Sequence, residues 1–434
     1  MKTQLFLSKK NKGEFIKFSV KISNLILLLN CFYPNTVFAQ YNTEFLNYRN
    51  TGRSICSNFS IDGGSNGMSN SLANKLIWGG YINSEIKKQS SQHLNKQNNL
   101  GINLNYNISA FYKGNEKFDY LIGIKNQEII NSTYSQDLFN LTFYGNQSFK
   151  NKSADLGNCN FNSLKFQEIK FGAMMHKVDT IGKIGISVSF IKGENLFYLN
   201  TNELSSLYTS ADGSEITFNS NFNMALSDAT NNNLISFNGM GASADIFFET
   251  PYKSKLGKKS ILTVSANNIG FIHWNNKSIQ YSSDSSLHFI GYKINNLNDL
   301  KDSTINRLNK DSLLRNLSNE RLEGFNMNIP TNLILINKIY FGKELFSLST
   351  GFRYIFNANY KPYLFIEPEY KLKNLTFTLH TGYGGYVRFN IGASIILNTE
   401  NWFIKIGSNS LQGFILPKSV FAQALYLTFA KKFK

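Results

Sequence analysis

The sequence is poor in charge, in proline and in long apolar runs. Charged residues make up 17% of its 434 residues, against about 25% in soluble domains, and only six prolines occur. After residue 39 no apolar run approaches the ~18 residues that a transmembrane helix needs. A bundle of membrane helices is therefore excluded for that part of the chain, and the low charge is unusual for a soluble domain.

Sequence motifs of metal binding and catalysis are missing as well. The five histidines form no HExxH pattern, and no GxSxG, P-loop or GxGxxG motif follows an apolar run. Cys56 and Cys159 lack the spacing of metal ligands, although they could pair in an oxidising envelope. A barrel can carry a catalytic Ser/His or Asp/His group at its rim, but no such pattern occurs. We predict a protein that is not an enzyme, with no cofactor and no metal site.

What the sequence has is alternation of apolar and polar residues. Between residues 100 and 112 apolar side chains stand at every second position, with Gly, Asn and Ser between them. This period of two is typical of a β-strand, because successive side chains point to opposite faces. The same alternation recurs over residues 120–125, 184–190, 346–354, 375–380 and 387–397.

The length and the connections of these runs indicate a membrane barrel. Most runs span about 9 to 12 residues, which suits a tilted transmembrane strand, and short turns join them in the last third. Consecutive strands should pair antiparallel, and closure removes edges that lipid would penalise. We predict an all-β fold, an antiparallel transmembrane meander β-barrel. A secreted β-sandwich or solenoid stays open, since alternation alone does not separate lipid from a protein core.

The first 39 residues read as an export signal. Six lysines accompany a short apolar stretch, and Val37 and Ala39 are the small residues that precede a cleavage site. A lipoprotein signal at Cys31 is the alternative, but Asn30 stands where that signal needs a small residue. The predicted domains are a signal peptide at 1–39, a polar N-terminal segment at 40–70, and a barrel with long loops at 71–434.

A short helical insert is predicted within residues 295–323, where leucines recur at helical spacings among charged residues. Such a helix would cover one barrel mouth or dock a partner. Loss of the signal removes six Lys and one Glu, which lowers the formal charge from +17 to +12. This surplus suits anionic outer membrane lipid or acidic glycans, and the absence of Lys/Arg clusters argues against nucleic acid. Phe433, next to the last residue, resembles the terminal aromatic signal that barrel assembly machinery reads.

Two sets of residues stand out as candidates for function. Asp245, Arg353, His380 and Arg388 fall on the polar faces of predicted strands, so we expect them to line a lumen. Gly270, Phe271 and Trp274 form a possible interface motif. A cluster of this kind often ends a strand at the membrane interface, where Trp is favoured.

Three segments carry a resemblance to a known family. They are SILTVSANNIGFIHW at 260–274, NGMGASAD at 238–245, and FNMNIPT at 325–331 with Ile329 where Leu is common. They resemble a family of uncharacterised outer membrane proteins of the Bacteroidota, the DUF5723 type. The resemblance implies location in the bacterial outer membrane, about 14 strands within a range of about 12 to 16, and periplasmic termini. It carries over no catalytic residue.

That family is similar in architecture to fatty acid transporter barrels and to barrel subunits of type IX secretion. Two functions therefore stay open. The first is passage of a small or hydrophobic solute across the outer membrane. The second is a non-conducting structural or docking barrel in an envelope secretion, gliding or adhesion complex, with an envelope protein as its partner.

Overall fold

The computed structural model describes residue 45 and residues 53–115, 117–176, 182–228, 231, 237–254, 259–290, 318–342, 344–416 and 418–433. The predicted signal peptide lies outside these residues, as does 295–317 of the predicted helical insert. Residues 319–322, at the end of that insert, form an extended strand, so the predicted helix does not reach residue 323.

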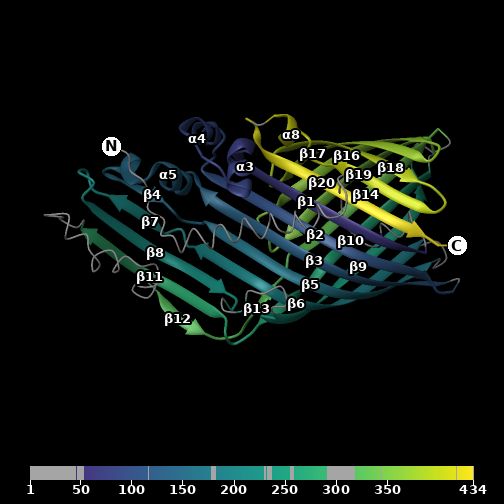
Figure 1. Ribbon diagram of the computed structural model, residues 1–434, viewed down its shortest axis with the longest axis horizontal. Coiled ribbons are helices and arrows are strands. Elements are labelled where there is room, and N and C mark those ends of the chain that lie inside the picture. Colours follow the sequence, from purple (N-terminus) through teal and green to yellow (C-terminus); the bar gives the residue numbers. More distant parts are fainter. Residues whose placement is uncertain are drawn as a thin grey trace.

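Fourteen antiparallel strands close into a barrel (Figure 1), which confirms the predicted all-β meander. Each strand pairs with the next one of the set, and the last pairs with the first from Ser54 opposite Lys432 onward. The barrel strands are β1 (Ser54–Ser69), β2 (Gln97–Lys113), β3 (Phe118–Ser135), β5 (Asn160–His176), β6 (Lys183–Thr201), β9 (Gly239–Lys253), β10 (Lys259–Trp274), β14 (Thr331–Phe341), β15 (Phe346–Phe356), β16 (Lys361–Leu372), β17 (Leu375–Gly385), β18 (Phe389–Asn398), β19 (Trp402–Ser408) and β20 (Val420–Lys432).

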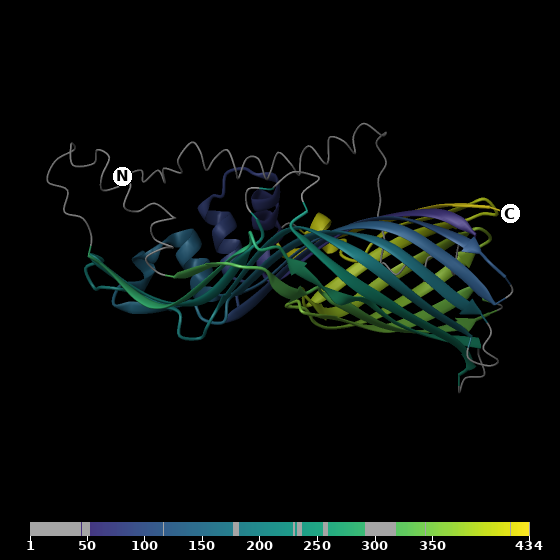
Figure 2. The same cartoon turned by 90° about the horizontal axis from the view of Figure 1, so that it is seen from below.

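One side of the barrel wall continues beyond the barrel as a curved sheet (Figures 1 and 2). The C-terminal part of β6, from Phe197 to Thr201, no longer pairs with β9 and pairs with β8 instead. β8 also pairs with β11. We call this the extension sheet. Its strands are β4 (Lys152–Asp155), β7 (Ser206–Thr209), β8 (Glu215–Leu226), β11 (Ile279–Ile290) and β12 (Asn319–Leu322), and β13 (Phe325–Asn328) pairs with the end of β10 nearby.

The helices lie at the same end as the extension sheet (Figure 1). Ser69, Asn83 and Ser135 cap three of them by accepting a hydrogen bond from a first-turn backbone N–H. Within the described ranges, no helix has the length and apolarity needed to cross a membrane. The helical elements are α3 (Asn70–Trp78), α4 (Ser84–Ser91), α5 (Gln136–Tyr144), the 3-10 turn η1 (Asn146–Phe149) and α8 (Gln412–Ile415).

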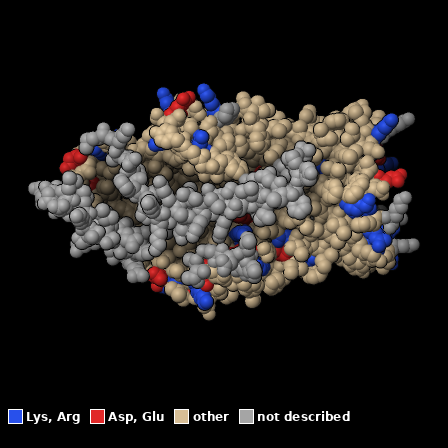
Figure 3. Space-filling model, viewed as in Figure 1, with Lys and Arg blue, Asp and Glu red and all other residues tan. Residues whose placement is uncertain are grey.

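The barrel wall is apolar outside and polar inside. On β17 the Leu379 side chain is 64% exposed, whereas the neighbouring His380 is 2% exposed. The same holds on β3, where Ile124 is exposed and Lys125 is buried. On the face in Figure 3, Lys, Arg, Asp and Glu gather at the barrel end near the end of β20, whereas the wall behind it consists mostly of other residues. This inverted arrangement is that of a barrel surrounded by lipid.

The boundary predicted for the barrel is wrong, because β1 is a barrel strand that lies within residues 40–70. β1 pairs with β2 and β20 along most of its length. Its polar residues face the lumen, where Asn58 Nδ2 donates to Asn107 Oδ1 at 2.8 Å. An Asn- and Gly-rich stretch therefore reads as a loop in sequence although its polar groups are satisfied inside a barrel.

Candidate functional site

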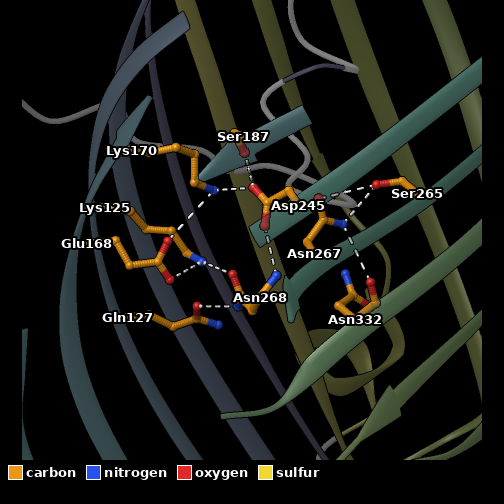
Figure 4. Close-up of polar contacts among 10 residues, drawn as sticks. All are labelled: Lys125, Gln127, Glu168, Lys170, Ser187, Asp245, Ser265, Asn267, Asn268 and Asn332. Atoms are coloured by element: carbon orange, nitrogen blue, oxygen red, sulfur yellow. Dashed lines mark hydrogen bonds and ion pairs between the residues drawn. The ribbon is translucent and has the colours of Figure 1, made fainter. Parts of the chain in front are cut away.

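The lumen holds a buried network of two cations and two anions (Figure 4). Lys125 comes from β3, Glu168 and Lys170 from β5, and Asp245 from β9. Lys125 Nζ lies 3.1 Å from Glu168 Oε1, and Lys170 Nζ donates to Asp245 Oδ2. We call these four residues the lumen network. Because the charges balance, each ion is compensated despite its removal from water.

A β-bulge completes the lumen network. The register of β10 against β9 shifts between Ala266 and Ile269, and Asn268 takes a positive φ of 61°, which Asn tolerates better than most residues. This conformation lets the Asn268 backbone N–H donate to Asp245 Oδ1 at 2.8 Å, while Asn268 Oδ1 accepts from Lys125 Nζ at 2.9 Å. Ser187 Oγ donates to Asp245 Oδ2 at 3.0 Å.

A second polar group lies on strands β15 to β17. His380 Nδ1 lies 2.8 Å from Glu367 Oε1, and its Nε2 contacts the Tyr363 hydroxyl. Arg353 Nε donates to Asn332 Oδ1 at 3.0 Å, and its guanidinium lies over the ring of Tyr360. The structure thus places the candidates Asp245, Arg353 and His380 inside the barrel, on different parts of its wall.

Two turns fold inward at the extension end of the barrel. Asn359, between β15 and β16, reaches across the mouth: its Nδ2 donates to Asn131 Oδ1 on β3 at 3.1 Å and to Asn160 Oδ1 on β5 at 2.9 Å. Tyr386, between β17 and β18, lies against Gly101 of β2. A Cβ atom on Gly101 would come within 2.1 Å of the Tyr386 ring, so the absence of a side chain there makes room for the turn.

The β15–β16 turn separates two spaces. On the lumen side of the turn is a cavity of about 80 Å³, which has room for only a few water molecules and is lined by Asp62, Lys125, Lys170, Arg353, Tyr360 and others. On the side of the extension sheet is a space of about 680 Å³ that we call the vestibule. Ala358 lines both spaces. The vestibule is lined by Asn131, Asn160, Asn162, Tyr198, Asn223, Met224, Ala225, Gln280, Tyr281, Ser282, Arg321, Glu323, Phe325, Asn326, Met327, Asn328, Asn357, Ala358 and Asn359.

The short-turn end of the lumen is filled by an apolar layer. Phe45 is almost fully buried there, with its ring 5.7 Å from that of Phe247. Cys56 is in this layer, whereas Cys159 accepts a hydrogen bond from Ser135 near the extension sheet, and no disulfide joins the two. The lumen is therefore closed at both ends. The layer consists of Phe45, Cys56, Phe111, Leu121, Met174, Phe247, Phe403 and Ala430.

Residues 51–407 match a protein family described as a family of unknown function, DUF5723. The chain belongs to this family. No curated protein matches the chain. The part of the chain that the structure describes contains no group of three or more His, Cys, Asp or Glu side chains that could hold a metal ion.

Several solved membrane barrels are similar to this DUF5723 protein in fold. A monoaromatic hydrocarbon channel, the TodX deltaS2S3 mutant, aligns over 91% of this chain and 93% of that one, at 10% identity and a TM-score of 0.46. The toluene transporter TbuX of Ralstonia pickettii covers 88% and 90%, at 11% identity and a TM-score of 0.40. The toluene transporter TodX of Pseudomonas putida covers 91% and 94%, at 8% identity and a TM-score of 0.37.

The structure corrects the predicted interface motif. Phe271 is exposed on the outer wall, but Trp274 is fully buried inside, in a cluster with Leu164, Ile272 and Ile329. The reason is the bulge at Asn268. Before it, even-numbered residues of β10 such as Val264 face outward, and after it even-numbered residues face inward, which includes Gly270 and Trp274.

Arg388 is not a lumen residue. It is exposed at the barrel mouth, where its Nη2 contacts Asn95 Oδ1 of the connection between α4 and β2. The alternating pattern of β18 starts only at Phe389, so residue 388 belongs to the turn. Nothing in the sequence marks Lys125, Glu168 and Lys170 as a site beyond their place on the polar side of an alternating run.

Proposed function

We propose that this DUF5723 protein is a bacterial outer membrane barrel that passes a small polar solute, and that the described state is closed. The wall supports a membrane setting, since its outer face is apolar and its inner face is polar. The observation that carries the proposal is the β15–β16 turn, which folds into the mouth and separates a vestibule from a polar lumen cavity.

The lining favours a polar solute over a hydrophobic one. Two closures bound the lumen, namely the apolar layer at the short-turn end and the β15–β16 turn at the other end. Lumen positions between them carry amides, hydroxyls and paired charges, as in the lumen network and around His380. A hydrocarbon would displace hydrogen bonds of these groups and return none, which costs free energy for each group left unpaired. A polar solute can replace them. We therefore narrow the predicted small or hydrophobic solute to a small polar one.

The proposed orientation places the short turns in the periplasm and the extension sheet outside the cell. Outer membrane barrels have short periplasmic turns and longer extracellular loops. Arg53, Lys113, Lys253, Lys371 and Lys432 lie at the ends of strands on the short-turn side. Their charge suits contact with anionic lipid headgroups. The proposal includes three further points: the barrel contacts membrane lipid, the barrel assembly machinery inserts it, and it comes from the Bacteroidota.

A non-conducting docking barrel is the second candidate. Two observations favour it: the lumen is closed at both ends, and the extension sheet presents a large ordered surface beyond the barrel. In this role the lumen residues would only stabilise the wall, and an envelope protein would bind the extension sheet.

Opening both closures separates the two candidates. Phe45→Ala truncates the one residue of the apolar layer that does not belong to a barrel strand. Asn359→Ala with Tyr360→Ala releases the β15–β16 turn. Because the closures are in series, we expect no conductance in planar bilayers from the wild type or from either partial variant. The triple variant should conduct at least about 10-fold above background.

The control is Tyr383→Ala. It also removes a tyrosine at the extension end of the barrel, but from the outer face of β17. It should leave conductance at background. Heat-dependent gel mobility reports whether each variant keeps a closed barrel. A triple variant that is heat-modifiable but silent contradicts passage and favours the docking barrel.

The membrane setting itself is tested by a charge on the wall. Leu379→Arg is expected to lower the free energy of unfolding in lipid vesicles by about 2–4 kcal/mol, the effect of Arg facing lipid near mid-depth. Leu322→Arg is the matched control, because Leu322 is 62% exposed but belongs to β12 of the extension sheet. It should change stability by less than about 0.5 kcal/mol. Equal effects in urea titrations of the two variants would argue against lipid around β17.

A further inference from the structure

The floor of the vestibule is one row of side chains across six strands. Paired positions on β3, β5, β6, β8, β11 and β12 follow one another without a gap. Paired residues project from the same face of a sheet, so the row presents its side chains together to the vestibule. The row reads Asn131, Asn162, Tyr198, Ala225, Gln280 and Arg321.

A second row runs beside the first one, two residues along each strand. It contains Asn160, Asn223 and Ser282, which also line the vestibule. The wall above the floor comes from β13 and the β15–β16 turn, with Asn326, Asn328, Asn357 and Asn359. The site is therefore built from strands that are far apart in the sequence, and amides surround it on both sides.

The chemistry of this lining indicates a neutral, hydroxyl-rich ligand. Each amide offers both donors and an acceptor, which matches hydroxyl groups that donate and accept at once. The charged lining residues are one Arg and one Glu, Arg321 and Glu323, so the lining has no net charge. Tyr198, Tyr281 and Phe325 add flat apolar faces of the kind that sugar rings stack on. The volume of about 680 Å³ lies within the range of small-molecule sites, about 300–1,000 Å³.

Two buried atoms of the floor point to the ligand group itself. Among the described residues, Asn131 Nδ2 and Asn162 Oδ1 have no hydrogen-bond partner, although these residues are only 1% and 4% exposed. They are direct neighbours across β3 and β5. Leaving a buried donor and a buried acceptor without a hydrogen bond costs free energy. One hydroxyl can satisfy both, since it accepts from Asn131 and donates to Asn162.

We propose that the vestibule is a binding site for a neutral oligosaccharide. The Asn131–Asn162 pair holds one hydroxyl, Gln280 and Arg321 bind further along the same row, and the aromatic rings stack on the sugar. The site is already present in the described closed state, so it does not depend on passage through the lumen and holds for a passage barrel and for a docking barrel. A failed conductance experiment therefore leaves it standing.

The test is calorimetric titration of the full chain, extracted in a sugar-free detergent, with maltotriose, cellotriose and chitotriose. We expect at least one of them to bind, and Asn162→Ala to weaken that binding by about 10-fold. The melting temperature of Asn162→Ala should not fall, because the variant removes an unsatisfied buried acceptor. Gln280→Ala, at a half-buried point of the row, should weaken binding as well.

Asn219→Ala is the matched control. Asn219 lies on the same face of β8 as Asn223 but outside the vestibule, where it bonds Ser206 and Ser286. The Asn219→Ala variant should bind the sugar with the same affinity as the wild type. The proposal is overturned if none of the three sugars binds at millimolar concentration, or if Asn162→Ala binds as tightly as the wild type. It is also overturned if the peptide Ser-Asn-Ser competes better than every sugar, which would mark a peptide site.

Discussion

Replacing Asp245 by alanine is expected to lower the free energy of unfolding by about 3–5 kcal/mol, the usual cost of removing one member of a buried ion pair. Lys170 loses its closest carboxylate, and its second carboxylate, Glu168, is 3.7 Å away and already bonds Lys125. The backbone N–H of Asn268 loses its acceptor too. The lumen network then holds two cations and one anion.

The compensating variant makes this prediction specific. Lys170→Met combined with Asp245→Leu removes one charge of each sign and leaves Lys125 with Glu168. We expect it to recover most of the lost stability, because apolar replacement of a whole buried pair is often neutral or favourable. Urea titrations in lipid vesicles measure both variants. If the double variant is as unstable as Asp245→Ala, charge balance is not what stabilises this part of the wall.

Replacing Trp274 by alanine is expected to cost about 3–5 kcal/mol as well, through lost apolar contact and the cavity left behind. The Trp274 ring packs closely on the backbone, since a Cβ atom on Gly193 would lie 3.0 Å from it. Gly193 has no side chain that could move into the space left by the ring, so the site has little means to collapse. A large cavity should therefore remain.

The matched control for Trp274 is Trp78, at the end of α3, whose side chain is exposed. Trp78→Ala should change stability by less than about 0.5 kcal/mol. A position of Trp274 at the membrane interface, as the sequence pattern predicts, would give a different result, namely a small effect that depends on the lipid. Equal and small losses in the two variants would restore that interpretation.

The strands of the barrel could be predicted from sequence because the alternation is local. A pattern such as Leu379 beside His380 indicates which side of the strand faces outward without knowledge of the neighbouring strand. The same pattern failed at two kinds of place. At β1 only Ile55, Phe59 and Ile61 mark the outer face, among many small and polar residues. At Asn268 a single extra residue inverts the phase of β10, which moves Trp274 inward.

The candidate site could not be predicted, because its contacts join distant parts of the chain. Asn359 bonds Asn131 across 228 positions, and Lys125 bonds Asn268 across 143. No residue type marks such pairs in advance, since Asn is common throughout the sequence. The vestibule floor likewise depends on the register of six strands, and one shifted residue would turn its amides to the opposite face.

The pairing of β1 with β20 has a consequence for how the barrel assembles. Ser54 lies opposite Lys432, so the seam joins nearly the two ends of the described chain. Hairpins such as β16–β17 can form early from residues close in sequence, whereas the seam has to wait until every other strand is in place. Until then the growing sheet has two unpaired edges that lipid cannot satisfy. In the proposed membrane setting we therefore expect seam closure to be the last step of assembly, and the step at which the two open edges are most exposed to mispairing.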